Sequence, residues 1–206
     1  MSRFIQAAAI IPTSYPERRR RRPVFMDPLR LIEKYYPAGS EAHRILLRHS
    51  LRVAGKAGEI ARRLAADKVD AEFVYEAAML HDIGMLFTDA PEIGCHGSLP
   101  YLCHGYKGRE LLEREGLHRH ALVCDRHIGV GLSAAEIVAQ GLPLPVRDML
   151  PLTEEERIVT YADLFFSKNP RENDSERPVE KVRQTIARYG EDKVVIFDQW
   201  HARFGG

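Results

Sequence analysis

The sequence predicts an all-α fold, a helical bundle with one core. Apolar residues recur close to the helical period of 3.6 in successive segments after residue 25. Serine, threonine or aspartate precedes several of these segments, as helix N-caps do, and β-hairpin signals are nearly absent. With 206 residues and no internal repeat, the chain is long enough for a single sizeable domain.

Residues 1–25 differ in composition from all that follows. A short apolar stretch, Ala7 to Ile11, is followed by prolines and five consecutive arginines, Arg18 to Arg22. We expect this segment to lack a fixed fold. It would be either a solvated tail or a stretch that precedes the true start codon. Met26 would then open the domain, which we place at 26–206, with Asp27 as an N-cap and Pro28 at the first helical position.

Two helices are predicted at the start of this domain. The first runs from about Pro28 to Tyr36, and the second from Ser40, as its cap, to about Ala66. His49 and Val53 are four residues apart on the second helix, so His49 lies on the stripe that faces the core.

The third predicted helix runs from its possible N-cap Asp70 to Leu80 and delivers His81 and Asp82 side by side at its end. Gly84 can end or bend this helix. Imidazole nitrogens and carboxylate oxygens are both ligands of divalent metals, and a carboxylate can bridge two ions. By itself, a His-Asp pair is also compatible with an ordinary structural role.

After a long irregular loop predicted at residues 85–101, two more helices each carry a histidine at one end. His104 stands at the entry of the helix from about Gly105 to Glu115, and His127 near the end of the helix from Leu117 to Ile128. On the latter helix, His118 and His120 are two apart and cannot face the same way. We expect both at the surface.

Capping-box patterns predict the next two helices. Ser133 to Glu136 begins a short helix that runs to Gln140, and Thr153 to Glu156 begins the helix that carries Asp163. Apolar neighbours place Asp163 on an inward face, where its carboxylate would be costly to bury unless a metal or cation neutralised it. The segment 141–145 is expected to be extended, and two further helices are predicted at Pro178 to Tyr189 and Glu191 to Phe204.

The ordered set His49, then His81-Asp82-Ile83-Gly84, then Asp163 resembles the HD-domain metal-dependent phosphohydrolases over roughly residues 40 to 170. His104 and His127 resemble the two extra histidines of the subset that holds two metals. The resemblance implies a helical metal-dependent enzyme that hydrolyses a phosphoester, with nucleotides among the substrates of relatives. One departure is Met85, because many relatives carry a lysine at that position.

Six ligands fit two ions better than one. His49, His81, Asp82 and Asp163 would surround the first ion, and His104 and His127 the second, with Asp82 bridging. Such ions can activate water and polarise a phosphoryl oxygen. Fe, Mn, Zn, Ni and Mg all remain open as the metal. Asp82 is also a catalytic candidate. Three cations are candidates for contacts with substrate phosphate, although an ordinary solvated role is the simpler interpretation of each one taken singly: Lys107, Arg126 and Lys168.

Two other functions remain open on the same residues: a di-iron oxygenase, and a non-catalytic domain that binds a nucleotide. A structural zinc site from Cys95-His96 and Cys103-His104 is disfavoured, because it lacks C-x-x-C spacing and would take His104 from the larger set.

Composition narrows the setting of the protein. The 30 basic and 29 acidic residues nearly balance, so charge does not argue for a nucleic-acid partner. Three cysteines are too few for a disulfide framework, which favours a reducing, cytoplasmic compartment. No apolar run reaches the ~20 residues that span a bilayer, so we expect no membrane association. The expected partner is a small phosphorylated substrate, and homo-oligomers remain possible.

Overall fold

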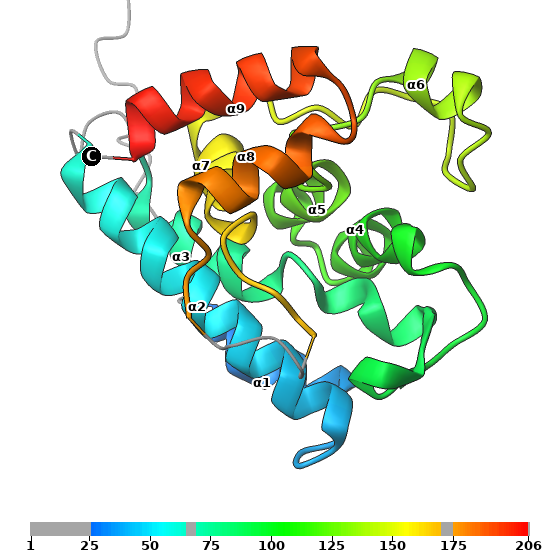
Figure 1. The fold of residues 1–206 in the computed structure, drawn as a ribbon. Coiled ribbons are helices and arrows are strands. Elements are labelled where there is room, and N and C mark those ends of the chain that lie inside the picture. The colour runs from blue at the N-terminus through cyan, green and yellow to red at the C-terminus, as the bar shows by residue number, and fades with distance from the viewer. Residues whose placement is uncertain (1–25, 65–68, 170–174, 206) are drawn as a thin grey trace, which may run out of the picture.

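The computed structural model describes residues 26–64, 69–169 and 175–205. The expectation for residues 1–25 therefore lies outside the described residues. Figure 1 shows helices packed around one core, and the strands found in the described ranges form one small pair. The all-α prediction is confirmed. Among the described residues, no helix combines the length and apolar character needed to cross a membrane.

The helices and the strand pair follow in chain order: α1 Pro28–Tyr35, α2 Glu41–Arg63, α3 Ala71–Leu80, the 3₁₀ turn η1 Ile83–Phe87, β1 Asp89–Ala90, η2 Pro91–Ile93, β2 Cys95–His96, η3 Tyr101–Cys103, α4 His104–Arg114, α5 His118–Arg126, α6 Ala134–Ala139, α7 Glu154–Asp163, α8 Val179–Ala187 and α9 Glu191–Phe204.

The predicted N-caps form because a short polar side chain needs only the backbone of the next turn as a partner. Asp27, Ser40, Asp70 and Ser133 each accept a hydrogen bond from a backbone N–H two or three residues ahead. The capping box at Ser133 is complete, since Glu136 also accepts from the Ser133 N–H at 2.8 Å.

At Thr153 the predicted capping box is only half formed. The threonine side chain accepts from the Glu156 N–H, but the Glu156 carboxylate accepts from the Leu152 N–H at 2.7 Å and from Arg126 at 2.8 Å. A charged partner brought in by α5 thus competes with the local contact, since hydrogen bonds between ionised groups are the stronger ones.

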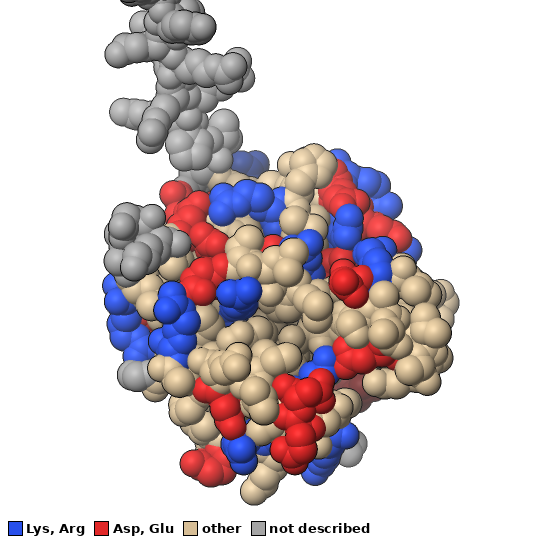
Figure 2. Space-filling view, turned by 90° about the horizontal axis from the view of Figure 1, so that it is seen from above, with Lys and Arg blue, Asp and Glu red and all other residues tan. Residues whose placement is uncertain are grey.

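The core lies where α2, α3 and α7 pack together, with α4 and α5 closing one side. In Figure 1, the long helix α2 runs along one edge, and the α8–α9 hairpin covers the top. Aromatic rings fasten α9 to α7: the Tyr161 ring lies 5.9 Å from Phe197 and 5.6 Å from Phe204, centroid to centroid. On the face seen in Figure 2, basic and acidic side chains are interspersed.

The structure corrects the predictions for two segments: residues 85–101 were expected to be an irregular loop, and residues 141–145 were expected to be extended. Residues 85–101 are not a structureless loop: they include most of η1, the antiparallel β1–β2 pair, η2 and the start of η3. Residues 141–145 form turns rather than an extended strand, with Gly141 at φ 58° and the Leu144 N–H donating to the Leu142 carbonyl at 2.8 Å. Short-range hydrogen bonds satisfy the backbone in both segments.

His120 is the third correction. We expected it at the surface, but it is 9% exposed, its ring packs edge-on to Phe73, and its Nε2 lies 3.1 Å from a Glu76 carboxylate oxygen. The apolar face of α5 is wider than its sequence indicates, because α3 packs against it. His118 is exposed, as predicted.

Candidate metal centre

Six side chains from five helices converge in the core. His49 projects from the middle of α2, His81 and Asp82 follow the last residue of α3, His104 opens α4, His127 follows α5, and Asp163 ends α7. All four histidines and Asp82 are at most 5% exposed. The structure thus brings together every residue proposed as a metal ligand, and their ligand role stays a prediction.

One group of four residues gathers on Oδ2 of Asp82. His49 Nε2 lies 3.2 Å and His81 Nε2 3.1 Å from this oxygen. Asp163 closes the group, with its Oδ1 2.9 Å from His49 Nε2. Four potential ligand atoms, two of them carboxylate oxygens, thus face one point.

The other oxygen of Asp82 faces a second group. Oδ1 lies 3.2 Å from His104 Nε2 and 3.4 Å from His127 Nε2. Asp82 therefore belongs to both groups, one through each oxygen, which is the arrangement of a carboxylate that bridges two ions.

Backbone carbonyls orient three of the four imidazole rings. Nδ1 of His81, His104 and His127 lies 2.7–2.8 Å from the carbonyl oxygen of the residue three positions earlier. A carbonyl only accepts hydrogen bonds, so Nδ1 must carry the proton. In the neutral ring, the Nε2 lone pair then points into the cluster, as metal-ligating histidines require.

The cluster fits metal ions on this structure's own geometry. The Nε2 atoms of His49 and His81 are 3.2 Å apart, and those of His104 and His127 are 3.1 Å apart. Both oxygens of Asp82 and Oδ1 of Asp163 are buried without a well-formed hydrogen bond among the described residues. Converging lone pairs in a dry core are costly unless cations neutralise them.

Electrostatics favours the ligating form of both carboxylates and of His104, but not of His81. Burial raises the pKa of the Asp82 carboxyl, but His81 and Lys168 outweigh it and hold that pKa well below its usual range. The pKa of Asp163 is lowered for similar reasons. Burial lowers the pKa of His104 to about 3, so this imidazole stays neutral. Burial lowers the pKa of the His81 imidazole, but Asp82 and Asp163 outweigh it and raise that pKa to about 10. Divalent metals require ionised carboxylates and neutral imidazoles, so an ion in the first group would displace the His81 proton.

The three candidate phosphate contacts lie in different places. Lys168 is at the cluster, with its Nζ 2.8 Å from Asp82 Oδ2 and 3.8 Å from Asp163 Oδ1. The other two cations are engaged by neighbouring acids: Lys107 pairs with Glu110 at 2.6 Å, and Arg126 pairs with Glu156 at 2.8 Å.

The turn after Asp82 is held by two contacts that sequence reasoning missed. A Cβ at Gly84 would lie 2.1 Å from the His104 carbonyl oxygen and 2.3 Å from the Gly108 nitrogen, so only glycine lets α4 pack here. Gly84 lies inside η1, and α3 has already ended at Leu80. The Tyr36 hydroxyl donates to the Ile83 carbonyl and accepts from the Leu86 N–H. The glycine was visible in the motif, but its neighbours on α4 were not.

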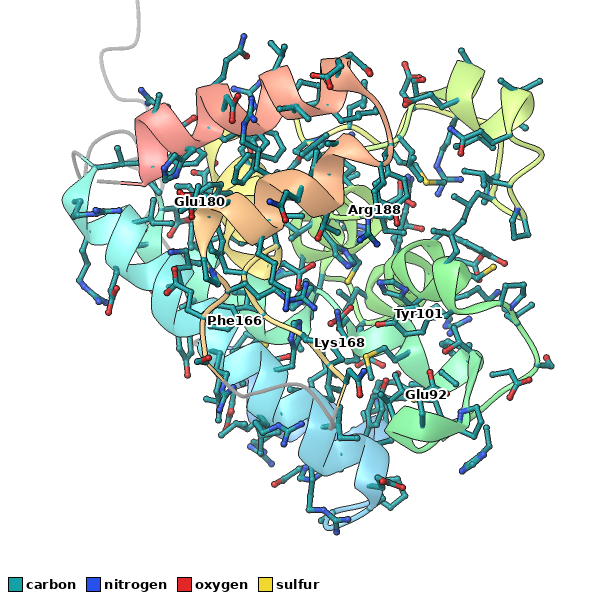
Figure 3. The ribbon with its side chains drawn as sticks, in the orientation of Figure 1. Glu92, Tyr101, Phe166, Lys168, Glu180 and Arg188 are labelled. Atoms are coloured by element: carbon teal, nitrogen blue, oxygen red, sulfur yellow. The ribbon has the colours of Figure 1, made fainter. Side chains whose placement is uncertain are left out.

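Lys168 lines a pocket of about 330 Å³. Figure 3 shows Tyr101, Phe166, Lys168 and Glu92 on segments that border it. The Tyr101 ring packs on His104 with centroids 4.6 Å apart, so one wall of the pocket is also the cover of the second ligand group. We call it the mouth pocket.

The model of the HD domain matches residues 46–166 of this sequence. The chain belongs to the HD-domain family. The matched range contains all six residues of the cluster, and the HD motif is His81-Asp82. Members of this family bind divalent metals, and both groups of this HD domain could hold one.

Three relatives show how far the similarity extends. An uncharacterized protein of Methanocaldococcus jannaschii is 35% identical over 66% of this chain and 76% of its own length. Two proteins named tRNA (cytidine(56)-2'-O)-methyltransferase are also similar. The one from Thermoplasma volcanium is 30% identical over 76% of this chain, and the one from Picrophilus torridus 32% identical over 61%. This HD chain covers only 42% and 33% of those two proteins. No solved structure matches it.

Proposed function

We propose that this HD domain is a metal-dependent phosphohydrolase that acts on a small phosphoester, most simply a nucleotide. The observation that carries the proposal is the position of Asp82, whose two oxygens each face a separate group of histidines. Two ions about one carboxylate suit the in-line displacement of phosphate esters.

Bound divalent ions would supply Lewis acidity, which polarises a phosphoryl oxygen and lowers the pKa of the attacking water. The protein's own residues would hold the ions and orient the substrate. The backbone carbonyls behind His81, His104 and His127 fix the ring directions. Lys168 faces the mouth pocket and can attract phosphate oxygens.

A hydrolysis screen over a panel of metals tests the proposal, with the nucleotide products separated by chromatography, because ring opening of a cyclic nucleotide and cleavage of a dinucleoside polyphosphate release no free phosphate. The protein is purified without oxygen, its metal content is measured, and it is then assayed with nucleoside monophosphates, cyclic nucleotides, dinucleoside polyphosphates and alarmone-like nucleotides. We expect hydrolysis of at least one class, lost in Asp82→Ala. A protein that carries two ions yet hydrolyses none of these nucleotides would contradict the proposal.

The same assays separate the alternatives. A di-iron oxygenase would consume dioxygen when loaded with iron, and would do so without releasing phosphate. A non-catalytic domain would bind a nucleotide and leave it intact. Hydrolysis is preferred because HD domains are typically hydrolases and because Lys168 places a cation where an anionic substrate would enter.

The screen should also include tRNA. Two relatives are named as tRNA methyltransferases, but this chain covers less than half of each, and a buried cluster of histidines and carboxylates suits metal binding rather than methyl transfer. Phosphate release from tRNA but from no small nucleotide would replace our expectation of a small substrate.

A further inference from the structure

Tyr101 lies between two parts of the centre that the proposed function uses, the second ligand group and Lys168. It is the first residue of η3, three positions before His104, and it lines the mouth pocket together with Lys168. Figure 3 labels both residues and shows them on different segments, η3 and the stretch after α7. The HD motif does not include Tyr101, and only the packing of these segments brings it to the metal centre.

The Tyr101 residue holds His104 through its backbone and its ring. Its carbonyl oxygen accepts a hydrogen bond from the backbone N–H of His104 and lies 2.7 Å from Nδ1 of the same residue. The tyrosine ring packs on the imidazole with centroids 4.6 Å apart and planes inclined by 31°. These contacts direct the other ring nitrogen, Nε2, to Asp82 Oδ1 at 3.2 Å.

The backbone around Tyr101 is fixed on both sides. Before it, the Leu99 carbonyl accepts a hydrogen bond from the Asp89 N–H at 2.8 Å, which ties this segment to the residues after η1. After it, the Cys103 N–H donates to the Pro100 carbonyl at 2.9 Å and closes the η3 turn. A tyrosine side chain has two rotatable χ bonds, so a fixed backbone and a packed ring leave its hydroxyl little freedom.

The hydroxyl of Tyr101 meets the ammonium of Lys168. The two groups are hydrogen-bond partners, and the same ammonium lies 2.8 Å from Asp82 Oδ2. Burial raises the pKa of the Tyr101 hydroxyl above its usual range and outweighs the opposite effect of Lys168, so the phenol keeps its proton and accepts through a lone pair. Partners on two sides restrict how the ammonium can turn, and thus the direction of its third N–H.

We propose that Tyr101 is a positioning residue of this centre: its hydroxyl directs Lys168 toward the phosphate of the substrate, and its ring holds His104 in place for the second ion. The proposal rests on the phosphohydrolase function proposed above and adds a residue to it. The hydroxyl would affect the binding of phosphate, and the ring would affect the binding of metal. Different substitutions of the same residue can therefore test the two parts separately.

Tyr101→Phe tests the hydroxyl, because it keeps the ring and the backbone. Protein loaded with Mn²⁺ is titrated with inorganic phosphate in a calorimeter, so the readout does not depend on hydrolysis. We expect about fivefold weaker binding in Tyr101→Phe, the equivalent of ~1 kcal/mol, and about tenfold weaker binding in Lys168→Ala. The double variant should bind phosphate as Lys168→Ala does, because a hydroxyl that acts through Lys168 has nothing to direct once the ammonium is gone.

Tyr101→Leu tests the ring, with metal per chain measured by mass spectrometry. We expect about one ion per chain in this variant and about two in Tyr101→Phe, because only the leucine removes the aromatic cover of His104 and ligand orientation sets metal affinity. Circular dichroism checks that Tyr101→Leu is folded, and Tyr101→Phe keeps the test decisive if it is not.

Tyr106 supplies matched controls for both substitutions. It lies on α4, five positions after Tyr101, and its hydroxyl has Cys103 as its partner instead of Lys168. Tyr106→Phe and Tyr106→Leu should bind phosphate and metal as the wild type does. Losses at Tyr106 equal to those at Tyr101 would show that any tyrosine in this region has the same effect, and would overturn the proposal.

The outcomes separate this inference from the function on which it rests. Wild-type phosphate binding in Tyr101→Phe, a further loss in the double variant, or a metal-loaded wild type that binds no phosphate would overturn the role of the hydroxyl. Two ions in a folded Tyr101→Leu would overturn the role of the ring. Hydrolysis found in the nucleotide screen would stand in each of these cases. The expected pattern without hydrolysis of any nucleotide would keep the positioning role and refute the phosphohydrolase.

Discussion

The two ligand groups share Asp82 but differ in their other ligands. The first adds a second carboxylate, Asp163, and has the Lys168 ammonium beside it, whose charge offsets that carboxylate. The second has the histidines His104 and His127 around the other Asp82 oxygen. The first group offers four ligand atoms and the second three, so we expect the first to hold its ion more tightly.

The groups also differ in how they are built. The first stands on α2, α3 and α7, which pack against one another in the core. The second stands on α4 and α5, which pack on each other and close one side of the core, and α4 packs closely on the HD turn at Gly84. The position of His104 thus depends on how closely α4 approaches this turn, so a change at Gly84 should disturb the second group first.

Loss of the shared residue should have the largest effect. Asp82→Ala removes one oxygen from each group, so we expect less bound metal at both and no detectable phosphate release. Metal per chain is measured by mass spectrometry, with Asp89→Ala, an exposed carboxylate on β1, as the control. Wild-type metal content in Asp82→Ala would show that this residue does not bridge.

Loss of a ligand from the second group alone should have the next largest effect. In His104→Ala or His127→Ala, about one ion per chain should remain, held by the first group. Hydrolysis should fall about 100-fold or more, because a lost Lewis acid forfeits several kcal/mol and each ~1.4 kcal/mol is tenfold in rate. The control is His118→Ala, an exposed histidine on α5. Unchanged metal content and rate in both variants would show that the centre holds only one metal ion.

A methyl group at the HD turn should disturb the second group through packing. Gly84→Ala is expected to lower the free energy of unfolding by about 1–3 kcal/mol, the usual cost of overpacking, and to reduce metal binding at His104 before it affects His49. Urea denaturation measures the stability. Gly55→Ala, on α2 with nothing within 4 Å of the new Cβ, should be neutral or slightly stabilising. Equal behaviour of the two variants would remove the special role of Gly84.

The smallest effect should come from the cation beside the first group. Lys168→Ala should keep both ions and raise KM for the phosphorylated substrate about tenfold, as the loss of one charge-assisted contact of ~1.4 kcal/mol would. Lys107→Ala is the comparison, since that ammonium pairs with Glu110 on the surface, and its KM should change less than about twofold, within the range of surface ion pairs. A larger effect at Lys107 would reverse the assignment of the phosphate contact.

The reach of sequence reasoning can be judged from individual residues. The caps Asp27, Ser40 and Asp70 were predictable because a cap involves only its own next turn. The six cluster residues were found as an ordered set, through the resemblance to the HD family rather than through periodicity. Each of them taken singly was compatible with an ordinary core histidine or carboxylate.

What the sequence determined by itself is therefore local or ordered along the chain: where helices begin, which faces are apolar, and the presence of the HD motif with its further histidines. The tertiary structure decided which charges meet. It brought Lys168 onto Asp82, tied Arg126 to Glu156 and buried His120 against Phe73. These contacts join residues 86, 30 and 47 positions apart, respectively. The packing of helices therefore selects them, and no short-range preference specifies them.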